Sequence, residues 1–331
     1  MTDNKCYKGY TSFLEERYGY RVYRIGVDAG FSCPNRFGKS KEGGCAFCDA
    51  MGARAMYLRS SESSYKRNSG FEEKLCARTS DAINEQDITD QIHKGASFIR
   101  KRYGSEHFSL YFQSFSNTFA PVETLERIYS HALSVMPFEE LIVSTRPDCI
   151  DEKKAALLAS YKGRVKNVMV ELGLQSGSDK ILKAMNRGHD VKCLIDASRI
   201  VKASGLELTL HVLLGYPGET YADIQKTVDV INTVMPDNIK IHNLNVVSGT
   251  KLYEDYLKGE VTSSCARRHI ENTVYILRRI SPEIVIERLI CETPGHRLAS
   301  PREFPEKNRY LIRLDKYMNE NNYKQGDLYK I

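Results

Sequence analysis

The stretch Cys33-Pro-Asn-Arg-Phe-Gly-Lys-Ser-Lys-Glu-Gly-Gly-Cys45-Ala-Phe-Cys48 places three cysteines within sixteen residues. Two residues separate Cys45 from Cys48, a spacing that lets two thiolates reach one metal centre. Glycines inside the loop allow it to fold back and bring Cys33 to the same place. Three soft ligands suit either zinc with a fourth ligand elsewhere or an iron–sulfur cluster. A four-iron cluster held by three thiolates keeps one iron open for a ligand that is not protein.

Composition sets the outer limits. The 331 residues can bury one large core or two modest ones, and 41% hydrophobic with 27% charged residues is ordinary for a globular protein. No apolar run approaches the roughly 20 residues of a membrane span. The N-terminus has no signal-peptide core, so we expect a cytoplasmic protein without membrane contact. Nine unevenly spaced cysteines fit a reducing compartment, and a net charge of +6 allows an anionic partner such as RNA without requiring one.

Strand and helix patterns alternate along most of the chain. A strand at 22–27 leads into the cysteine loop, and a polar segment at about 49–86 is expected to be a long surface excursion. Further apolar runs predict strands at 108–112, 141–143, 168–172, 206–214 and 239–244. Helical stripes lie between them at 88–103, from 121, and at 151–161, 191–203 and 222–234. Such βα units require a parallel sheet covered by helices.

The cysteine loop, with Asp28-Ala-Gly-Phe-Ser directly before it, resembles the radical S-adenosylmethionine (SAM) superfamily. The resemblance is closest to the YhcC/YtqA branch, which is related to the radical subunit of Elongator. Phe47 takes the place of the aromatic residue that precedes the third cysteine in this family. The eleven residues between the first two cysteines, instead of the usual three, are what this branch shows.

The resemblance implies an α/β fold, a partial (β/α)6 TIM-like barrel. The six predicted strands agree with it. We expect an N-terminal segment (1–21) packed on the barrel, the barrel itself (22–262) and a small C-terminal extension (263–331). Chemistry in parallel barrels lies at the C-terminal ends of the strands, where the cysteine loop follows the first strand.

The implied activity depends on two cofactors, a [4Fe–4S] cluster on Cys33, Cys45 and Cys48, and SAM on the open iron. One electron from a flavodoxin- or ferredoxin-type donor would break the bond between the sulfonium and the 5′ carbon. The resulting 5′-deoxyadenosyl radical would take a hydrogen atom from a substrate. Kinship with Elongator suggests tRNA, as the side chain of a modified wobble uridine, while a small metabolite or a protein substrate remains open.

Polar residues follow the second and third predicted strands. Gln113 and Ser114 stand where the superfamily holds the amino group of SAM, although turn or capping roles explain them equally well. Arg146 and Asp148 belong to Ser-Thr-Arg-Pro-Asp after the third strand, which resembles an Elongator-like motif. The arginine could bind a carboxylate or an anionic substrate, or the two residues could pair with each other.

The fourth strand carries a carboxylate. Glu171 interrupts an apolar run and needs a partner, for which we favour the ribose hydroxyls of SAM over a salt bridge to Arg146. Gln175, in Glu-Leu-Gly-Leu-Gln, is assigned to the same cofactor. Arg187, in Asn-Arg-Gly-His, is expected to reach SAM or substrate, and His189 to mark a helix boundary.

The fifth and sixth strands complete the expected site. In the superfamily the end of the fifth strand packs against adenine, which assigns Val212, Leu213 and Gly215 to that wall. His242 and Asn245 follow on the sixth strand as candidate substrate residues, with a satisfied core histidine as the default for His242.

A zinc-stabilised binding protein is the alternative from another class. It would use the three cysteines with Cys76 or a histidine, and would be colourless and indifferent to SAM. The βα alternation and the strand-end motifs favour the enzyme.

Overall fold

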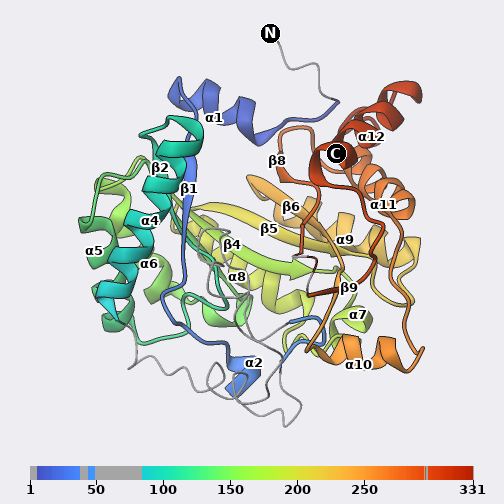
Figure 1. The fold of residues 1–331 in the computed structure, drawn as a ribbon, viewed down its shortest axis with the longest axis horizontal. Helices are drawn as coiled ribbons and strands as arrows, with labels where there is room; N and C mark the ends of the chain where they lie inside the picture. Colours follow the sequence, from blue (N-terminus) through green and yellow to red (C-terminus); the bar gives the residue numbers. More distant parts are fainter. Residues whose placement is uncertain (1–5, 38–43, 49–83, 294, 296, 331) are drawn as a thin grey trace.

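The computed structural model describes residues 6–37, 44–48, 84–293, 295 and 297–330. Within these residues the main sheet has seven parallel strands in the order β1-β2-β3-β4-β5-β6-β8. They are β1 (Tyr23–Val27), β2 (Phe108–Phe112), β3 (Glu140–Thr145), β4 (Asn167–Gln175), β5 (Glu207–Leu214), β6 (Asn238–Asn243) and β8 (Val285–Arg288). Neighbouring strands of this sheet follow one another in the chain, and helices connect them. The sheet curls into a half-barrel (Figure 1). The predicted α/β partial barrel is confirmed.

Helices cover the outer face of this sheet (Figure 1). They are α4 (Glu85–Tyr103), α5 (Val122–Ser134), α6 (Glu152–Ser160), α8 (Val191–Ala203), α9 (Tyr221–Val234) and α11 (Ala266–Arg279), with α12 (Lys307–Glu320) beside α11. The helix α1 (Tyr10–Tyr18) precedes β1 at one end of the barrel. The short helices α2 (Pro34–Phe37), α7 (Asp179–Ala184) and α10 (Lys251–Leu257) lie at the opposite end, where the strands terminate. A small second sheet pairs β7 (Val246–Val247) with β9 (Leu298–Ser300).

The strand count differs from the six that the sequence predicts. The seventh strand, β8, comes from the segment that we assigned to the C-terminal extension, and it pairs in parallel with β6. The helix α11 supplies the connection between them, so this segment adds one more βα unit to the sheet. The sequence predicts a helix at 267–279 and a strand at 284–291 here, but the strand–helix alternation weakens beyond about residue 260, so both were assigned to the extension. The predicted domain boundaries stay predictions, and residues 49–83 of the expected excursion lie outside the described residues.

The two ends of the described chain meet at the last strand. The Ile286 amide donates to the Lys8 carbonyl at 2.8 Å, and the Lys8 amide donates to Oε1 of Gln325 at 2.9 Å. The Gln325 amide in turn donates to the Cys6 carbonyl at 2.8 Å. Residues from both ends therefore hold β8 in place.

The two faces of the sheet differ in polarity. Outward side chains such as Ile25 and Phe112 are completely buried against the helices in the main hydrophobic core. Inward positions are largely polar, since Arg24, Glu171 and Lys240 contact one another inside the barrel. A polar lumen inside an apolar shell indicates a site rather than a packed interior.

A substitution at Gly177 tests how tightly the loop after β4 packs on α9. A methyl group at this position would lie 2.4 Å from the Lys226 carbonyl oxygen, which is helix backbone and cannot move aside cheaply. We expect Gly177→Ala to lower the free energy of unfolding by about 3 kcal/mol, as overpacking does. Gly163→Ala is the matched control, because a methyl group added there would have nothing within 4 Å. Urea denaturation of both variants measures the difference, and equal stabilities would contradict this packing.

Candidate active site

The cysteine loop lies at the end of the barrel where the strands terminate. Two hydrogen bonds fix its second half, from the Ala46 amide to the Met185 carbonyl (3.0 Å) and from the Leu252 amide to the Ala46 carbonyl (2.8 Å). Asn186 adds a third, because its Nδ2 donates to the Gly44 carbonyl at 2.8 Å. The loop is therefore anchored on the segments around α7 and α10.

Cationic and polar donors surround the Cys45 thiol. Its sulfur lies 3.5 Å from Nη1 of Arg187, 3.5 Å from Nδ2 of Asn35 and 3.9 Å from Nη1 of Arg146. Burial raises the pKa of this thiol, but the Arg187 guanidinium and its companions outweigh burial, so the pKa lies below its usual value. The pKa of Cys33 is raised, chiefly by burial. Cys45 is thus surrounded by groups that favour its thiolate.

The donor set fits an iron–sulfur cluster in chemistry. In the described part of the chain, no three His, Cys, Asp or Glu side chains are gathered as a group that could hold a metal ion. The three thiols of the loop are nevertheless the soft ligands that such clusters require. Two buried nitrogens near the ends of the strands, Nε2 of Gln113 and Nε of Arg187, have no hydrogen-bond partner among the residues that the structure describes. Buried polar atoms without partners call for a further group to satisfy them.

The segment after β2 lies beside the loop after β1. The Gln113 amide donates to the Val27 carbonyl at 3.3 Å, and the Ser116 amide donates to the Ser32 carbonyl at 3.2 Å. Ser114 is buried, and the next residue, Phe115, has a φ of 59°. Left-handed backbone at a residue with a side chain costs energy and is concentrated at functional sites. The structure brings Gln113 and Ser114 to the expected end of the barrel.

Arg146 and Asp148 pair with each other. Nε and Nη2 of Arg146 donate to the two carboxylate oxygens of Asp148 at 2.8 and 2.9 Å. This is the second of the two arrangements that the sequence leaves open. Because Nη1 of the same guanidinium faces Cys45, the pair positions a cation beside the cysteine loop.

Glu171 has different partners from those expected. Its carboxylate is completely buried and forms an ion pair with Lys240, while Tyr111 donates to it at 2.7 Å. Nε2 of His211 lies 2.8 Å from the same carboxylate, and Nη1 of Arg24 lies 3.4 Å from it. The alternative salt bridge to Arg146 is not formed, because Arg146 pairs with Asp148, while the expected contact with the ribose of SAM stays a prediction. Glu171 lies inside the lumen, where residues of four other strands contact it.

A second carboxylate extends this buried group. Glu287 of β8 forms an ion pair with Arg24 of β1, accepts a hydrogen bond from Thr209 at 2.7 Å, and lies 3.6 Å from Lys240. Burial and the Arg24 cation lower the pKa of Lys240 to about 8, while both carboxylates oppose this shift. The pKa of Glu171 lies well below its usual value, because Lys240 and His211 outweigh the effect of burial. We call Arg24, Glu171, Lys240 and Glu287 the lumen network.

The end of β4 brings Gly173, Gln175 and Arg187 together. Nη2 of Arg187 donates to the Gly173 carbonyl at 3.2 Å. Gln175 has a φ of 67° at a register shift in the pairing with β5. A bulge with left-handed backbone re-aims side chains, often beside an active site.

Gly173→Ala should displace Arg187 without unfolding the protein. The added methyl would lie 2.5 Å from Nη2 of Arg187 and 2.7 Å from Nε2 of Gln175, which are ends of flexible side chains. The displaced guanidinium would no longer donate to Cys45, and hydrogen bonds to cluster ligands raise the reduction potential. We expect a more negative midpoint potential of the reconstituted protein, with SAM affinity lowered about tenfold or more.

Redox titration followed by EPR checks this expectation. Arg187→Met removes the same contact directly and serves as the matched variant. A change in Arg187→Met that is absent in Gly173→Ala would show that the methyl group is accommodated without moving the guanidinium.

The three residues assigned to the wall at the end of β5 have different surroundings. Leu213 belongs to a hydrophobic cluster with Ala46 and Tyr216, and Phe47 packs against this cluster. Val212 is completely buried in the main core between sheet and helices, so only its backbone could contact a flat ring. Gly215 has a φ of 96°, and a methyl group there would lie 2.9 Å from Cβ of Ser264. The structure thus brings Phe47 and Leu213 to one wall.

The two candidates near the end of β6 have separate environments. Asn245 donates to Oγ1 of Thr293 at 2.9 Å and to the Cys291 carbonyl at 3.3 Å, which ties its loop to the segment after β8. His242 has its ring 5.4 Å from that of His211, and its Nε2 is buried without a partner. Among the described residues nothing satisfies this nitrogen, and both interpretations of His242, a core histidine and a substrate residue, stay predictions.

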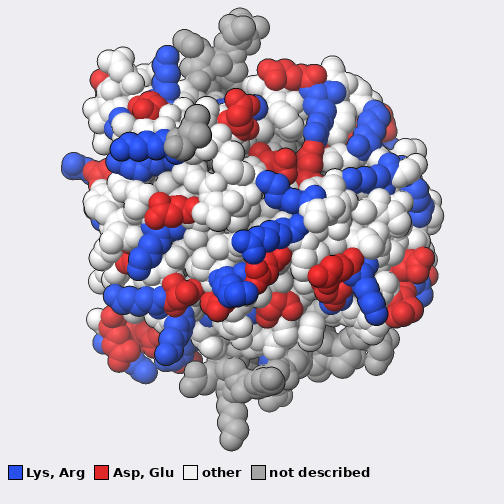
Figure 2. Space-filling model, turned by 180° about the vertical axis from the view of Figure 1, so that it is seen from behind, with Lys and Arg blue, Asp and Glu red and all other residues white. Residues whose placement is uncertain are grey.

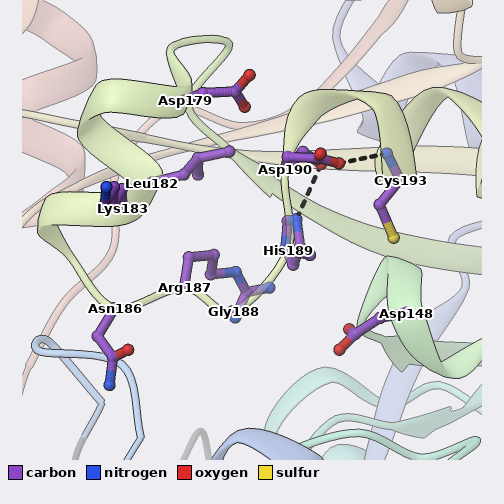
Figure 3. A pocket seen from close by; sticks show the side chains of 10 residues that line it. All are labelled: Asp148, Asp179, Leu182, Lys183, Asn186, Arg187, Gly188, His189, Asp190 and Cys193. Atoms are coloured by element: carbon purple, nitrogen blue, oxygen red, sulfur yellow. Dashed lines mark hydrogen bonds between the residues drawn. The ribbon is translucent and has the colours of Figure 1, made fainter.

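An open cleft of about 700 Å³ lies beside Arg187 (Figure 3). It is lined by Asp148, Asp179, Leu182, Lys183, Asn186, Arg187, Gly188, His189, Asp190 and Cys193. Burial and the cations of Arg187 and Arg146 lower the pKa of His189 to about 3, so its imidazole is neutral. Asp190 caps α8 by accepting from the Cys193 amide at 2.8 Å, which agrees with the expected helix boundary.

Several residues of this region were missed from the sequence. Arg24 and Lys240 are charged residues inside apolar strands, which is the same signal that singled out Glu171. Asn35 and Asn186, which contact each other and the cysteine loop, gave no comparable signal.

Two family models match the chain. The model of the radical SAM superfamily matches residues 42–231, and that of the radical SAM C-terminal domain matches residues 236–320. None of the helices in the described residues has the length and hydropathy needed to cross a membrane.

Individual relatives agree with these models. Protein YhcC of Escherichia coli strain K12 is 28% identical over 93% of this chain and 90% of its own length. A tRNA uridine(34) acetyltransferase of Methanocaldococcus infernus is 37% identical over 36% of this chain and 22% of its own length. The solved structure of archaeal M. infernus Elp3, lacking its N-terminus, shares the fold. Its TM-score is 0.62 at 22% identity, covering 73% of this chain and 60% of that one.

Proposed function

This chain belongs to the radical SAM superfamily, and from that premise we propose that Cys33, Cys45 and Cys48 bind its cluster and that its substrate is a tRNA. A [4Fe–4S] cluster and SAM are the cofactors of this enzyme class, and the alternative of a zinc-stabilised binding protein is not supported. The reduced cluster and SAM, held at the end of the barrel, would supply the radical chemistry that abstracts a hydrogen atom from a substrate. The single observation that carries the ligand assignment is the anchored three-cysteine loop at the end of the barrel.

The chain's own residues would orient these groups. Arg187, Arg146 and Asn35 donate toward Cys45, which offsets negative charge on its sulfur. Gln113 has a buried amide nitrogen without a partner, which supports its assignment to the amino group of SAM. Gln175 and the wall of Phe47 and Leu213 are proposed to contact the rest of the cofactor.

A tRNA substrate, at a wobble uridine, is supported by the relative that is named for uridine 34 of tRNA. The net charge of +6 is compatible with it. Basic and acidic side chains are interspersed over the face shown in Figure 2, which offers no uniformly basic surface there. We therefore place the contact with tRNA at the end of the barrel that carries the cysteine loop.

Anaerobic reconstitution tests the enzyme class. The protein is loaded with iron and sulfide and reduced, and its EPR spectrum is recorded with and without SAM. A four-iron signal that shifts with SAM, together with 5′-deoxyadenosine, supports the assignment. A colourless protein that gives no four-iron signal and does not cleave SAM overturns it.

The nucleoside profile of tRNA tests the substrate. Total tRNA from a strain that lacks the gene is digested and compared with that of the parent strain. A changed wobble uridine supports the proposal, and an unchanged profile rejects it in favour of a small metabolite or a protein. A flavodoxin or ferredoxin is the proposed electron donor.

A further inference from the structure

Arg288 is a cation beside the lumen network that has no carboxylate partner among the described residues. In the lumen network, the two cations Arg24 and Lys240 are matched by the two carboxylates Glu171 and Glu287. Arg288 follows on β8, is exposed, and forms no ion pair or hydrogen bond with any described residue. Its charge acts on the side chains of the lumen, since it adds to the burial and the Arg24 cation that lower the pKa of Lys240 and opposes the burial that raises the pKa of Tyr111.

The local backbone explains why Arg288 is turned toward this region. The pairing of β6 with β8 shifts register between Ile239 and Lys240, so that Lys240 pairs with Arg288 instead of Glu287. A bulge of this kind places two consecutive side chains against one partner and bends the strand. Glu287 is thereby free to pair with Arg24, and Arg288 is left at the open edge of the sheet.

His242 belongs to β6, the strand with which Arg288 pairs. It is two residues beyond Lys240 on the same strand, and it pairs in register with Leu213, which packs with Ala46 of the cysteine loop. Its Nε2 is buried and has no partner among the described residues. Burial and the charge of Arg288 hold its pKa well below the usual value, so the ring is neutral and keeps one N–H to donate.

We propose that His242 and Arg288 form a subsite for an anionic oxygen group of the substrate, a phosphate or a carboxylate. A neutral imidazole N–H and a guanidinium are both donors, and an anion would satisfy the unpaired nitrogen and pair with the guanidinium. His242 follows Lys240 along β6, so the subsite lies toward the end of the barrel that carries the cysteine loop. The inference rests on the proposed function for its role in substrate binding, but the anion site itself requires neither SAM nor tRNA.

Nitrogen NMR of the histidine-labelled, cluster-loaded protein tests the site directly. Inorganic phosphate and acetate are titrated separately at constant ionic strength, and the Nε2 resonance of His242 is followed. We expect a saturable shift of this resonance, with the proton on Nε2. The shift should be lost in Arg288→Gln. It should be retained in the control Arg267→Gln, which removes a surface arginine of α11. The anion that binds more tightly shows whether the substrate group is a phosphate or a carboxylate. An absent shift, or an equal shift in Arg288→Gln, overturns the proposal.

Kinetics separates this inference from the proposed function. With tRNA from the deletion strain as probe, Arg288→Gln should raise KM about 10- to 100-fold relative to the parent protein and to the control Arg267→Gln, the loss expected for one charged hydrogen bond. If the parent protein cleaves SAM but ignores tRNA, the tRNA proposal fails, and the phosphate and acetate titrations still decide the anion subsite.

Discussion

Cys45→Ser is expected to yield a protein without an iron–sulfur cluster and without SAM cleavage. Serine is a hard oxygen ligand that does not replace a thiolate at such a cluster. The donors from Arg187, Arg146 and Asn35 would then face a neutral hydroxyl in place of a sulfur anion. Iron and sulfide content, visible absorption and 5′-deoxyadenosine formation should all fall to background after anaerobic reconstitution.

Cys193→Ser is the matched control for this loss. Cys193 is another partly buried thiol close to Arg187, in the first turn of α8, and it stands outside the cysteine loop. The control should keep its cluster and its activity. A Cys45→Ser protein that retains a four-iron cluster would contradict the ligand assignment, and equal losses in both variants would point to damage of the fold.

Lys240→Met is expected to cost about 3–5 kcal/mol of unfolding free energy, the penalty for breaking a buried ion pair on one side. Lys240 is 1% exposed and Glu171 is not exposed at all, so no water can replace the lost partner. Two carboxylates would remain in the lumen network with Arg24 as their only cation among the described residues. Denaturant unfolding of the apoprotein measures the loss.

The double variant Glu171→Leu/Lys240→Met tests whether the loss of stability comes from leaving a buried charge without its partner. Removing both partners leaves Arg24 with Glu287, a balanced pair, so the double variant should be more stable than Lys240→Met alone. A double variant whose loss equals the sum of the two single losses would mean that the pair has no coupling energy. The network would then be a set of independent contacts.

The fold could be predicted well because buried parallel strands leave a local signal. The strand at 108–112 and the helix at 191–203 were predicted with the bounds that the structure shows, and Gly104 ends α4 in left-handed backbone as expected. The strand at 284–291 was predicted but was placed outside the barrel, because the strand–helix alternation weakens beyond about residue 260. Local sequence gave no reason to join it to β6, which lies about forty residues earlier in the chain.

The site could be predicted less well because its partners are distant in sequence. The loop of Cys33, Cys45 and Cys48 is contiguous and was found at once. Glu171 was recognised as a carboxylate in need of a partner, but the answer lies on other strands, at Lys240 and Arg24. Pairing across a barrel depends on the stagger of the strands, which hydrophobic periodicity does not encode.

The position of β8 has a consequence for biosynthesis. Translation delivers Arg24, Glu171 and Lys240 well before Glu287, and Gln325, which helps hold β8, comes almost last. Until Glu287 emerges, a nascent barrel would enclose two cations and one carboxylate, an arrangement that the low-dielectric interior disfavours. We therefore expect the barrel to close only after Glu287 has left the ribosome. Ribosome-bound chains truncated before β8 should remain sensitive to protease, whereas the released protein should resist it.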